Sequence, residues 1–270
     1  ATSVDKIEEL LLLGVKSFVV DNTNDLESLL ETVAHAERKI TLYLRLRLQE
    51  HSIHTGKHFV FGFLAKEVNR LVPELREHPL ITNIAVHFHR KTQNISEWNL
   101  KEELEDTLSE ETLSCISFLN IGGGIPVRYK NSRDRLAHIL LAIKTLRLWL
   151  QEKQISLVIE PGRFLAAPCI ELHTEIVNIY DHTLILNCSV YNAAMDTFIA
   201  NVRLAVQGEL EKGQAYTLKG CTPDSVDIFR YRVFLENPQV GDSIVFLNAG
   251  AYTFHSDFCF LEKLETEILE

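Results

Sequence analysis

Hydrophobic and polar positions change their period repeatedly over the first 167 residues. Apolar residues recur at helical spacing from 4 to 13, and Gly14 follows as a natural helix end. Strict alternation over 40–48 predicts a strand with one buried face. The same reasoning predicts helices over 24–36, 64–75, 97–108 and 133–151, a buried strand over 17–21, and strands over 84–89, 116–121 and 156–160. Strands that alternate with helices indicate a parallel sheet covered by helices.

The pattern changes after residue 167. Short alternating segments predict strands over 172–180, 183–190, 197–206, 215–218, 243–247 and 264–269, with turn residues between them and no strong helix. We therefore predict an α/β domain over 1–167 and an all-β domain over 168–270. The first domain has the pattern of a parallel sheet with covering helices, and no internal repeat is evident.

Composition and charge narrow the class of protein. Hydrophobic residues make up 46% and charged residues 24%, which is typical of a globular chain. The net charge of −10 argues against a general nucleic-acid binder, and no apolar run is long enough to span a membrane. The N-terminus does not look like a signal peptide. The cysteines are scattered without a CxxC spacing, which fits a reducing cytoplasm better than zinc or disulfide frameworks. They are Cys115, Cys169, Cys188, Cys221 and Cys259.

Three candidate groups follow the predicted strands, at the end where (β/α) barrels carry their chemistry. Gly122, Gly123 and Gly124 come after the strand over 116–121. Consecutive glycines let backbone N–H groups approach an anion such as a phosphate, although a tight strand-to-helix turn would need them as well.

The strand over 156–160 ends on Glu160, with Arg163 three residues further on. The carboxylate could pair with a protonated ring nitrogen and the guanidinium with a phosphate, or the two could form a structural ion pair. His87 and His89 alternate on a strand and face one way. A metal pair is conceivable, but the sequence offers no third ligand, so a stacking or core histidine is favoured over a metal site.

Two motifs lie in the predicted β-domain. Tyr252, in the segment GAYT over 250–253, could donate its hydroxyl to an anion or could be a packed aromatic. The polar segment GCTPDSVD over 220–227 is either a substrate loop or a turn.

Taken together, the order and spacing of GGG, EPGR, GCTPDSVD and GAYT resemble those of the fold-type III pyridoxal-phosphate decarboxylases, from about residue 10 to the C-terminus. That family acts on ornithine, lysine, arginine and meso-diaminopimelate, in amino-acid metabolism and polyamine biosynthesis. The resemblance implies a (β/α)8 barrel followed by a C-terminal β-domain, with pyridoxal 5'-phosphate as cofactor.

The resemblance also implies roles for single residues. His89 matches the histidine that stacks on the pyridoxal ring. Glu160 matches the acid that keeps the pyridine nitrogen protonated, so that the ring can accept electrons. The positions that match phosphate ligands are Gly122, Gly123, Gly124, Arg163 and Tyr252.

For the substrate, Asp224 matches an acid that the family contributes across a homodimer interface. Cys221 is a second candidate catalytic residue in the same loop, because the family carries Cys-Asp where this chain has Pro223 and Asp224. The resemblance therefore implies a homodimer with shared active sites.

Two further departures are evident. The family's HxGSQ motif reads HRKTQ here, with Lys91 in place of a phosphate-contacting glycine. The cofactor lysine of the family lies on the first barrel strand, and neither Lys57 nor Lys66 has a matching context. We therefore expect the chain to begin near the fourth barrel strand.

The sequence thus favours decarboxylation of a basic or diamino acid that depends on pyridoxal phosphate. The alternative is a non-catalytic homologue that acts as a regulatory or ligand-binding protein, which the missing lysine supports. A racemase on a similar barrel is a weaker third reading, because GGG together with EPGR points to the decarboxylases.

Overall fold

The computed structural model describes residues 2–48, 61–133, 135–252 and 254–269. The chain forms two compact units. The first, here called the barrel unit, consists of Ala1–Gly124 and Arg135–Pro161. The second, the β unit, consists of Ile125–Asp134 and Gly162–Glu270.

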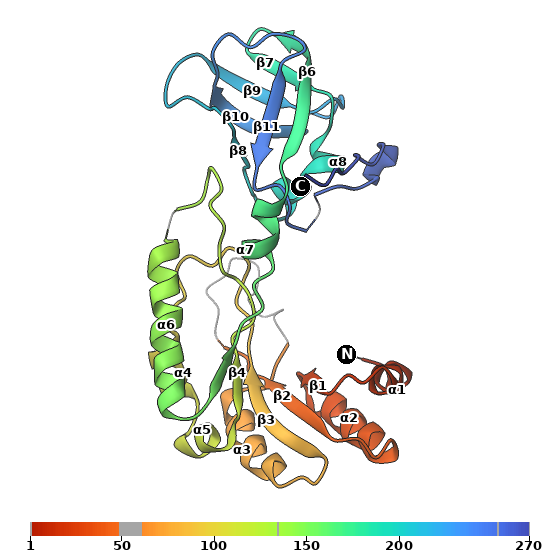
Figure 1. The fold of residues 1–270 in the computed structure, drawn as a ribbon, viewed down its shortest axis with the longest axis vertical. Helices are drawn as coiled ribbons and strands as arrows, with labels where there is room; N and C mark the ends of the chain where they lie inside the picture. Colours follow the sequence, from red (N-terminus) through yellow and green to blue (C-terminus); the bar gives the residue numbers. More distant parts are fainter. Residues whose placement is uncertain (1, 49–60, 134, 253, 270) are drawn as a thin grey trace. The chain divides into compact units, whose positions relative to one another are not determined.

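Strands and helices alternate along the barrel unit, as the hydrophobic pattern predicts. The strands are β1 (Ser17–Val20), β2 (Ile40–Arg45), β3 (Ile81–His87), β4 (Phe118–Asn120) and β5 (Ser156–Val158). The helices are α1 (Val4–Leu12), α2 (Thr23–His35), α3 (Ala65–Arg76), α4 (Leu100–Thr107), α5 (Glu110–Cys115) and α6 (Leu136–Glu152). The strands form one parallel sheet in sequential order, β1-β2-β3-β4-β5, as in part of a barrel (Figure 1).

The alternation in β2 has the expected physical cause. Leu42 and Leu44 are fully buried, whereas Tyr43 and Arg45, which alternate with them, lie on the other face and are half-buried. β1 is less buried than predicted, since only Val20 of its four residues is buried among the described residues.

Strand register places the ends of the strands beside one another. Arg45 pairs with His87, His87 with Asn120, and Asn120 with Val158. Residues that pair in a parallel sheet share a face, so these side chains form a row across the sheet. The next residues on that face lie beyond the strand ends, where His89, Gly122 and Glu160 follow.

The described residues of the β unit form a six-stranded sheet of order β10-β9-β7-β6-β11-β8. They are β6 (Leu172–Tyr180), β7 (Thr183–Leu186), β8 (Ala205–Val206), β9 (Ala215–Lys219), β10 (Ile228–Phe234) and β11 (Ser243–Leu247). Its short helices are α7 (Arg163–Ala166), η2 (Ala167–Cys169), α8 (Val190–Ala193), α9 (Asp196–Ile199) and η3 (Phe258–Phe260). The pairs are antiparallel except β7 with β9. The core includes Phe229 and Phe246, whose rings stack at 5.0 Å.

The predicted strand over 197–206 is wrong in its first half. The chain forms α9 there and only the two-residue β8 at the end, because backbone amides bond to carbonyls three or four residues earlier. Thr, Phe and Ile favour strands locally, and the turn overrides that preference. The predicted strand over 264–269 is also wrong, since residues 261–269 contain no helix or strand. The alternating segment that forms β10 was not predicted.

The division between the units differs from the predicted boundary at residue 167. The barrel unit ends at Pro161, and residues 125–134 belong to the β unit. Backbone and side-chain hydrogen bonds hold this segment there: Lys130 N–H donates to the Arg203 carbonyl at 2.9 Å, and Asn131 Nδ2 donates to the Asn201 carbonyl at 2.7 Å. In the described part of the chain, no helix is both long and apolar enough to cross a membrane.

A buried carboxylate fixes the loop over 220–227 to the β unit. Asp227 is fully buried and accepts hydrogen bonds from Ser189 Oγ at 2.9 Å and Val190 N–H at 2.8 Å. It also accepts from the amide of Thr222 at 3.1 Å and its hydroxyl at 2.7 Å. Of the two acids in this loop, Asp227 therefore has a structural function.

Replacing Asp227 with Ala should reduce the free energy of unfolding of the β unit by about 3 kcal/mol, because four donors lose a charged acceptor and some stay buried. Denaturant unfolding monitored by circular dichroism measures the change. The control is Asp242→Ala, since Asp242 is exposed and its carboxylate accepts from Gln239 N–H alone among the contacts described. Equal destabilisation by the two variants would contradict this role of Asp227.

Candidate functional site

A polar cluster lies where the strands of the barrel unit end. Asn120, the last residue of β4, donates from Nδ2 to Glu160 Oε1 at 2.7 Å. His87, the last residue of β3, places Nε2 at 3.9 Å from Glu160 Oε2. The cluster thus joins a carboxylate, an amide and an imidazole from three strand ends.

His87 is a buried, neutral histidine. Burial lowers its pKa to about 4, and the positive charge of Arg45 acts in the same direction, while Glu160 opposes both. The ring therefore adds no positive charge beside Glu160 at neutral pH. Its Nδ1 is buried and has no hydrogen-bond partner among the described residues.

His89 lies beyond β3 with an exposed face. Its pKa is lowered from the usual value by partial burial and by the charge of Arg45. Its Nδ1 accepts the backbone N–H of Gly123 at 3.2 Å, which leaves the proton of the neutral ring on Nε2. The imidazole is thus held in one orientation, as a stacking residue requires.

The three glycines allow the backbones of neighbouring strands to approach closely. A Cβ atom at Gly122, where φ is +63°, would lie 2.7 Å from the Phe88 carbonyl oxygen. A Cβ atom at Gly123 would lie 2.8 Å from the Glu160 carbonyl oxygen. Tight packing by itself therefore requires glycine at these two positions.

The amides of the glycine turn differ in what they contact. The N–H of Gly122 donates to Asn120 Oδ1 at 2.8 Å, and that of Gly123 donates to His89. Within the described residues, no acceptor contacts the amide of Gly124. Gly124 has a φ of +91° and passes close to the Lys91 carbonyl oxygen, while the Lys91 ammonium lies 3.3 Å from Glu97.

In the β unit, Arg163 is the centre of a buried ion pair. Its Nη1 donates to Asp196 Oδ2 at 2.5 Å and to the Tyr129 hydroxyl at 3.1 Å. Both charged side chains are largely buried. Burial acts to lower the pKa of Arg163, but Tyr129 and Asp196 outweigh it and raise that pKa. Burial likewise raises the pKa of Tyr129, so its hydroxyl stays protonated.

Tyr252 lies beside this pair. The guanidinium carbon of Arg163 is 4.6 Å from the centre of its ring, a cation–π distance. Tyr252 has a φ of +53°, an uncommon conformation for an aromatic residue, and it is 65% exposed. The ring is therefore partly open to a ligand while it contacts the arginine. The strain fits a functional position.

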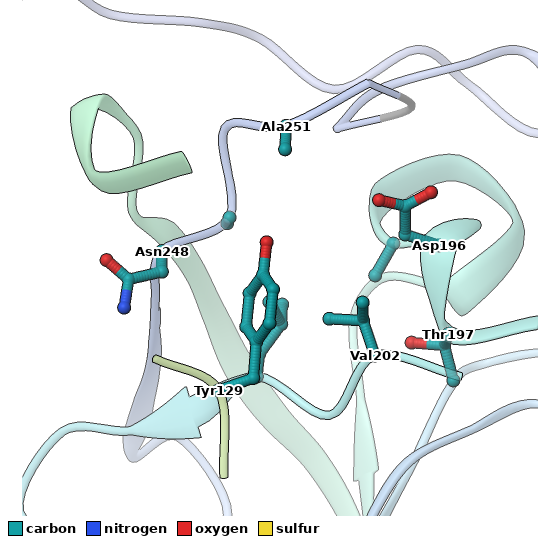
Figure 2. A pocket seen from close by; sticks show the side chains of 9 residues that line it. Tyr129, Asp196, Thr197, Val202, Asn248 and Ala251 are labelled. Carbon is teal, nitrogen blue, oxygen red and sulfur yellow. The ribbon is translucent and has the colours of Figure 1, made fainter. Parts of the chain in front are cut away.

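Figure 2 shows the small pocket next to this ion pair. The ring of Tyr129 stands in the pocket with its hydroxyl toward Ala251, between Asn248 on one side and Asp196 and Thr197 on the other. The pocket thus combines apolar walls with a few polar groups.

The loop over 220–227 presents Asp224 at the surface. Asp224 Oδ2 accepts from the Tyr191 hydroxyl at 2.5 Å, and this hydrogen bond lowers the pKa of the carboxyl group. The Tyr191 ring stacks on Phe258 at 5.8 Å and lies 5.2 Å from Phe198. Asp224 is therefore an exposed, ionised carboxylate, held by a tyrosine that packs against two phenylalanines.

Cys221 is exposed in the same loop, and its N–H donates to the Cys188 carbonyl at 3.0 Å. Partial burial and the charge of Asp227 raise the pKa of its thiol. Cys221 is therefore a protonated thiol at neutral pH and could act as a proton donor, but not readily as a nucleophile.

Sequence reasoning missed several residues of these clusters, among them Arg45, Asn120 and Asp196. Arg45 could have been found, because it shares a face with Tyr43 on a predicted strand. Asn120 lies inside an otherwise hydrophobic strand, and Asp196 directly precedes the predicted strand over 197–206, so neither gave a local signal. Thr253, the last residue of GAYT, and Lys57 lie outside the described residues.

In the described part of the chain, no group of three His, Cys, Asp or Glu side chains could hold a metal ion.

Comparison with known proteins gives a consistent result. The diaminopimelate decarboxylase of Pseudomonas aeruginosa is 28% identical over 269 residues, covering 93% of this chain and 64% of the relative. That of Zymomonas mobilis is 21% identical over 267 residues, covering 93% of this chain and 63% of the relative. The chain thus spans just under two thirds of the length of these relatives.

Solved structures share the fold. Diaminopimelate decarboxylase of Helicobacter pylori, complexed with L-lysine, has a TM-score of 0.76 at 20% identity, covering 96% of this chain and 69% of that one. Lysine/ornithine decarboxylase of Vibrio vulnificus, complexed with cadaverine, has a TM-score of 0.71 at 23% identity, covering 97% and 72%. Both support the prediction of a barrel followed by a β-domain.

The family profile described as "Pyridoxal-dependent decarboxylase, pyridoxal binding domain" matches residues 1–167, which is more than half of the chain. The resemblance inferred from the motifs is therefore confirmed. The chain belongs to the pyridoxal-dependent decarboxylase family.

Proposed function

We propose that this chain supplies the cofactor- and substrate-binding residues of an enzyme that decarboxylates a basic or diamino acid with pyridoxal phosphate. The observation that carries the proposal is the Glu160 carboxylate, held beside two neutral histidines where the parallel strands end. When bound, the cofactor supplies an electron sink for the bond that breaks as CO₂ leaves.

The residues of the barrel unit fit a pyridine ring. Glu160 is about half exposed, at 52% of its side chain, so it can contact a ligand while Asn120 fixes one of its oxygens. An ionised carboxylate that faces a ring N–H keeps that nitrogen protonated. The exposed face of His89 offers a neutral surface for stacking.

For the phosphate, we propose the amide of Gly124 as a ligand, because the amides of Gly122 and Gly123 are already used in hydrogen bonds that hold the turn in place.

Within the β unit by itself, we propose Arg163 and Tyr252 as an anion-binding pair, since the guanidinium lies against the tyrosine ring. Asp196 already compensates part of the charge of Arg163.

For the substrate, we propose a compound with a distal amine that Asp224 binds. The names of the relatives support this class, since diaminopimelate, lysine and cadaverine all carry such an amine. The lowered pKa of Asp224 keeps its charge available for a cation over a wide pH range. We propose further that the chain forms a homodimer in which Asp224 serves the neighbouring site.

A ligand-binding homologue without catalytic activity is the second candidate. The observation behind it concerns the described part of the chain alone, where the barrel-unit strands carry polar groups that can bind a ligand and no lysine. Binding of a cofactor–substrate conjugate is expected in either case, whereas release of CO₂ from a diamino acid is expected of the enzyme alone.

The double variant Arg163→Ala/Asp196→Ala should bind pyridoxal phosphate roughly 10- to 100-fold more weakly than the original chain. It removes a charged phosphate contact without leaving a buried carboxylate unpaired. Quenching of tryptophan fluorescence measures the affinity, and pyridoxal without phosphate is the matched ligand. Arg203→Ala, in the same unit, is the control variant. An equal loss of affinity for both ligands would argue against a phosphate contact by Arg163.

Asp224→Asn should lower the affinity for a reduced phosphopyridoxyl-lysine conjugate by about tenfold and leave that for phosphopyridoxyl-norleucine unchanged, because only lysine carries a distal cation. Isothermal titration calorimetry measures both. Tyr191→Phe should raise the pKa of Asp224, so the preference for the lysine conjugate should disappear at a higher pH as the solution is acidified. Equal affinity of the original chain for both conjugates would exclude Asp224 as the amine-binding residue.

A further inference from the structure

We infer that Asn120 is the positioning residue that ties the carboxylate of Glu160 to the glycine turn. The inference rests on the proposed function for its consequence, but the hydrogen bonds that carry it belong to the barrel unit by itself. Asn120 is buried, with 5% of its surface exposed.

Both ends of the Asn120 amide are used. Nδ2 donates to Glu160 Oε1 at 2.7 Å, and Oδ1 accepts from the N–H of Gly122 at 2.8 Å. The backbone adds a parallel connection, since Glu160 N–H donates to the Gly122 carbonyl at 2.7 Å. A movement of the glycine turn would therefore carry the carboxylate with it.

Only a primary amide can make this bridge at this length. An aspartate could accept from Gly122 but would set a second carboxylate against Glu160, and an alanine could make neither bond. An amide side chain also orients the carboxylate without neutralising it. Because His87 is neutral as well, the charge of Glu160 stays available for a protonated ring nitrogen.

The register explains why this position holds the bridging residue. Asn120 lies between His87 on β3 and Val158 on β5, in the last paired row of the sheet. Its side chain lies on the same face as theirs. Two residues further along on that face, Gly122 follows Asn120 and Glu160 follows Val158, and the Asn120 amide reaches both. Val158, the neighbour in the row, has no polar group that could do the same.

The first experiment uses the chain without ligand. In Asn120→Ala, the carbon-13 signal of the Glu160 carboxyl group and the amide signal of Gly122 should both shift, because each group loses its hydrogen-bond partner. NMR of the labelled protein measures both signals, with Glu160→Gln to assign the first. Asn83→Ala on β3 is the control and should leave both signals unchanged, because Asn83 Nδ2 lies 3.4 Å from Thr41 Oγ1 in a row near the start of the strand. Unchanged Glu160 and Gly122 signals in Asn120→Ala would overturn the inference.

The second experiment tests the consequence with two ligands, pyridoxal phosphate and its analogue with carbon in place of the ring nitrogen. The original chain should prefer pyridoxal phosphate by about tenfold, and Glu160→Gln should lose this preference. Asn120→Ala should reduce the preference to about twofold while its affinity for the carbon analogue stays unchanged. A general loss of structure would lower the affinity for both ligands equally. If Asn120→Ala does not fold, Asn120→Asp replaces it, because an aspartate can still accept from Gly122 N–H.

The outcomes separate the inference from the proposed function. If Glu160→Gln loses the preference and Asn120→Ala retains it in full, Glu160 acts without Asn120 and the inference fails. If the original chain shows no preference for the ring nitrogen, the proposed function fails, and the NMR signals of Glu160 and Gly122 in Asn120→Ala decide the inference independently.

Discussion

The candidate site depends on the close approach of the glycine turn to the two segments beside it. Side chains at Gly122 or Gly123 would push the turn away from Phe88 and Glu160. Without that approach, neither Asn120 nor His89 could accept a backbone N–H from the turn. The hydrogen bonds that orient the carboxylate and the imidazole thus require glycine at 122 and 123, whatever ligand the turn contacts.

In both units, the polar clusters contain little uncompensated positive charge. In the barrel unit, the imidazoles of His87 and His89 are neutral because of burial and because Arg45 repels a second positive charge. In the β unit, the buried Arg163 has Asp196 as its counter-ion. The attraction between the two charges offsets part of the free energy needed to remove the guanidinium from water. Removing either partner would leave the other as an unpaired buried charge.

Much of the fold could be predicted from pattern alone. The strict alternation that forms β2 and the apolar segments that form β6 and β11 report one-sided burial, which is a local property of the chain. The predictions failed where the environment decides. The segment that forms α9 has strand-forming residues but closes a turn.

The site divides in the same way. The sequence by itself determined which residues end the parallel strands, and so identified His89, the three glycines, Glu160 and Arg163 as candidates. It determined the family as well, through the order of its motifs. Only the tertiary structure decided what these groups contact, because the partners lie far apart along the chain: 40 residues separate Asn120 from Glu160, and 33 separate Arg163 from Asp196. Strand register and turn geometry set such distances, and no local pattern encodes them.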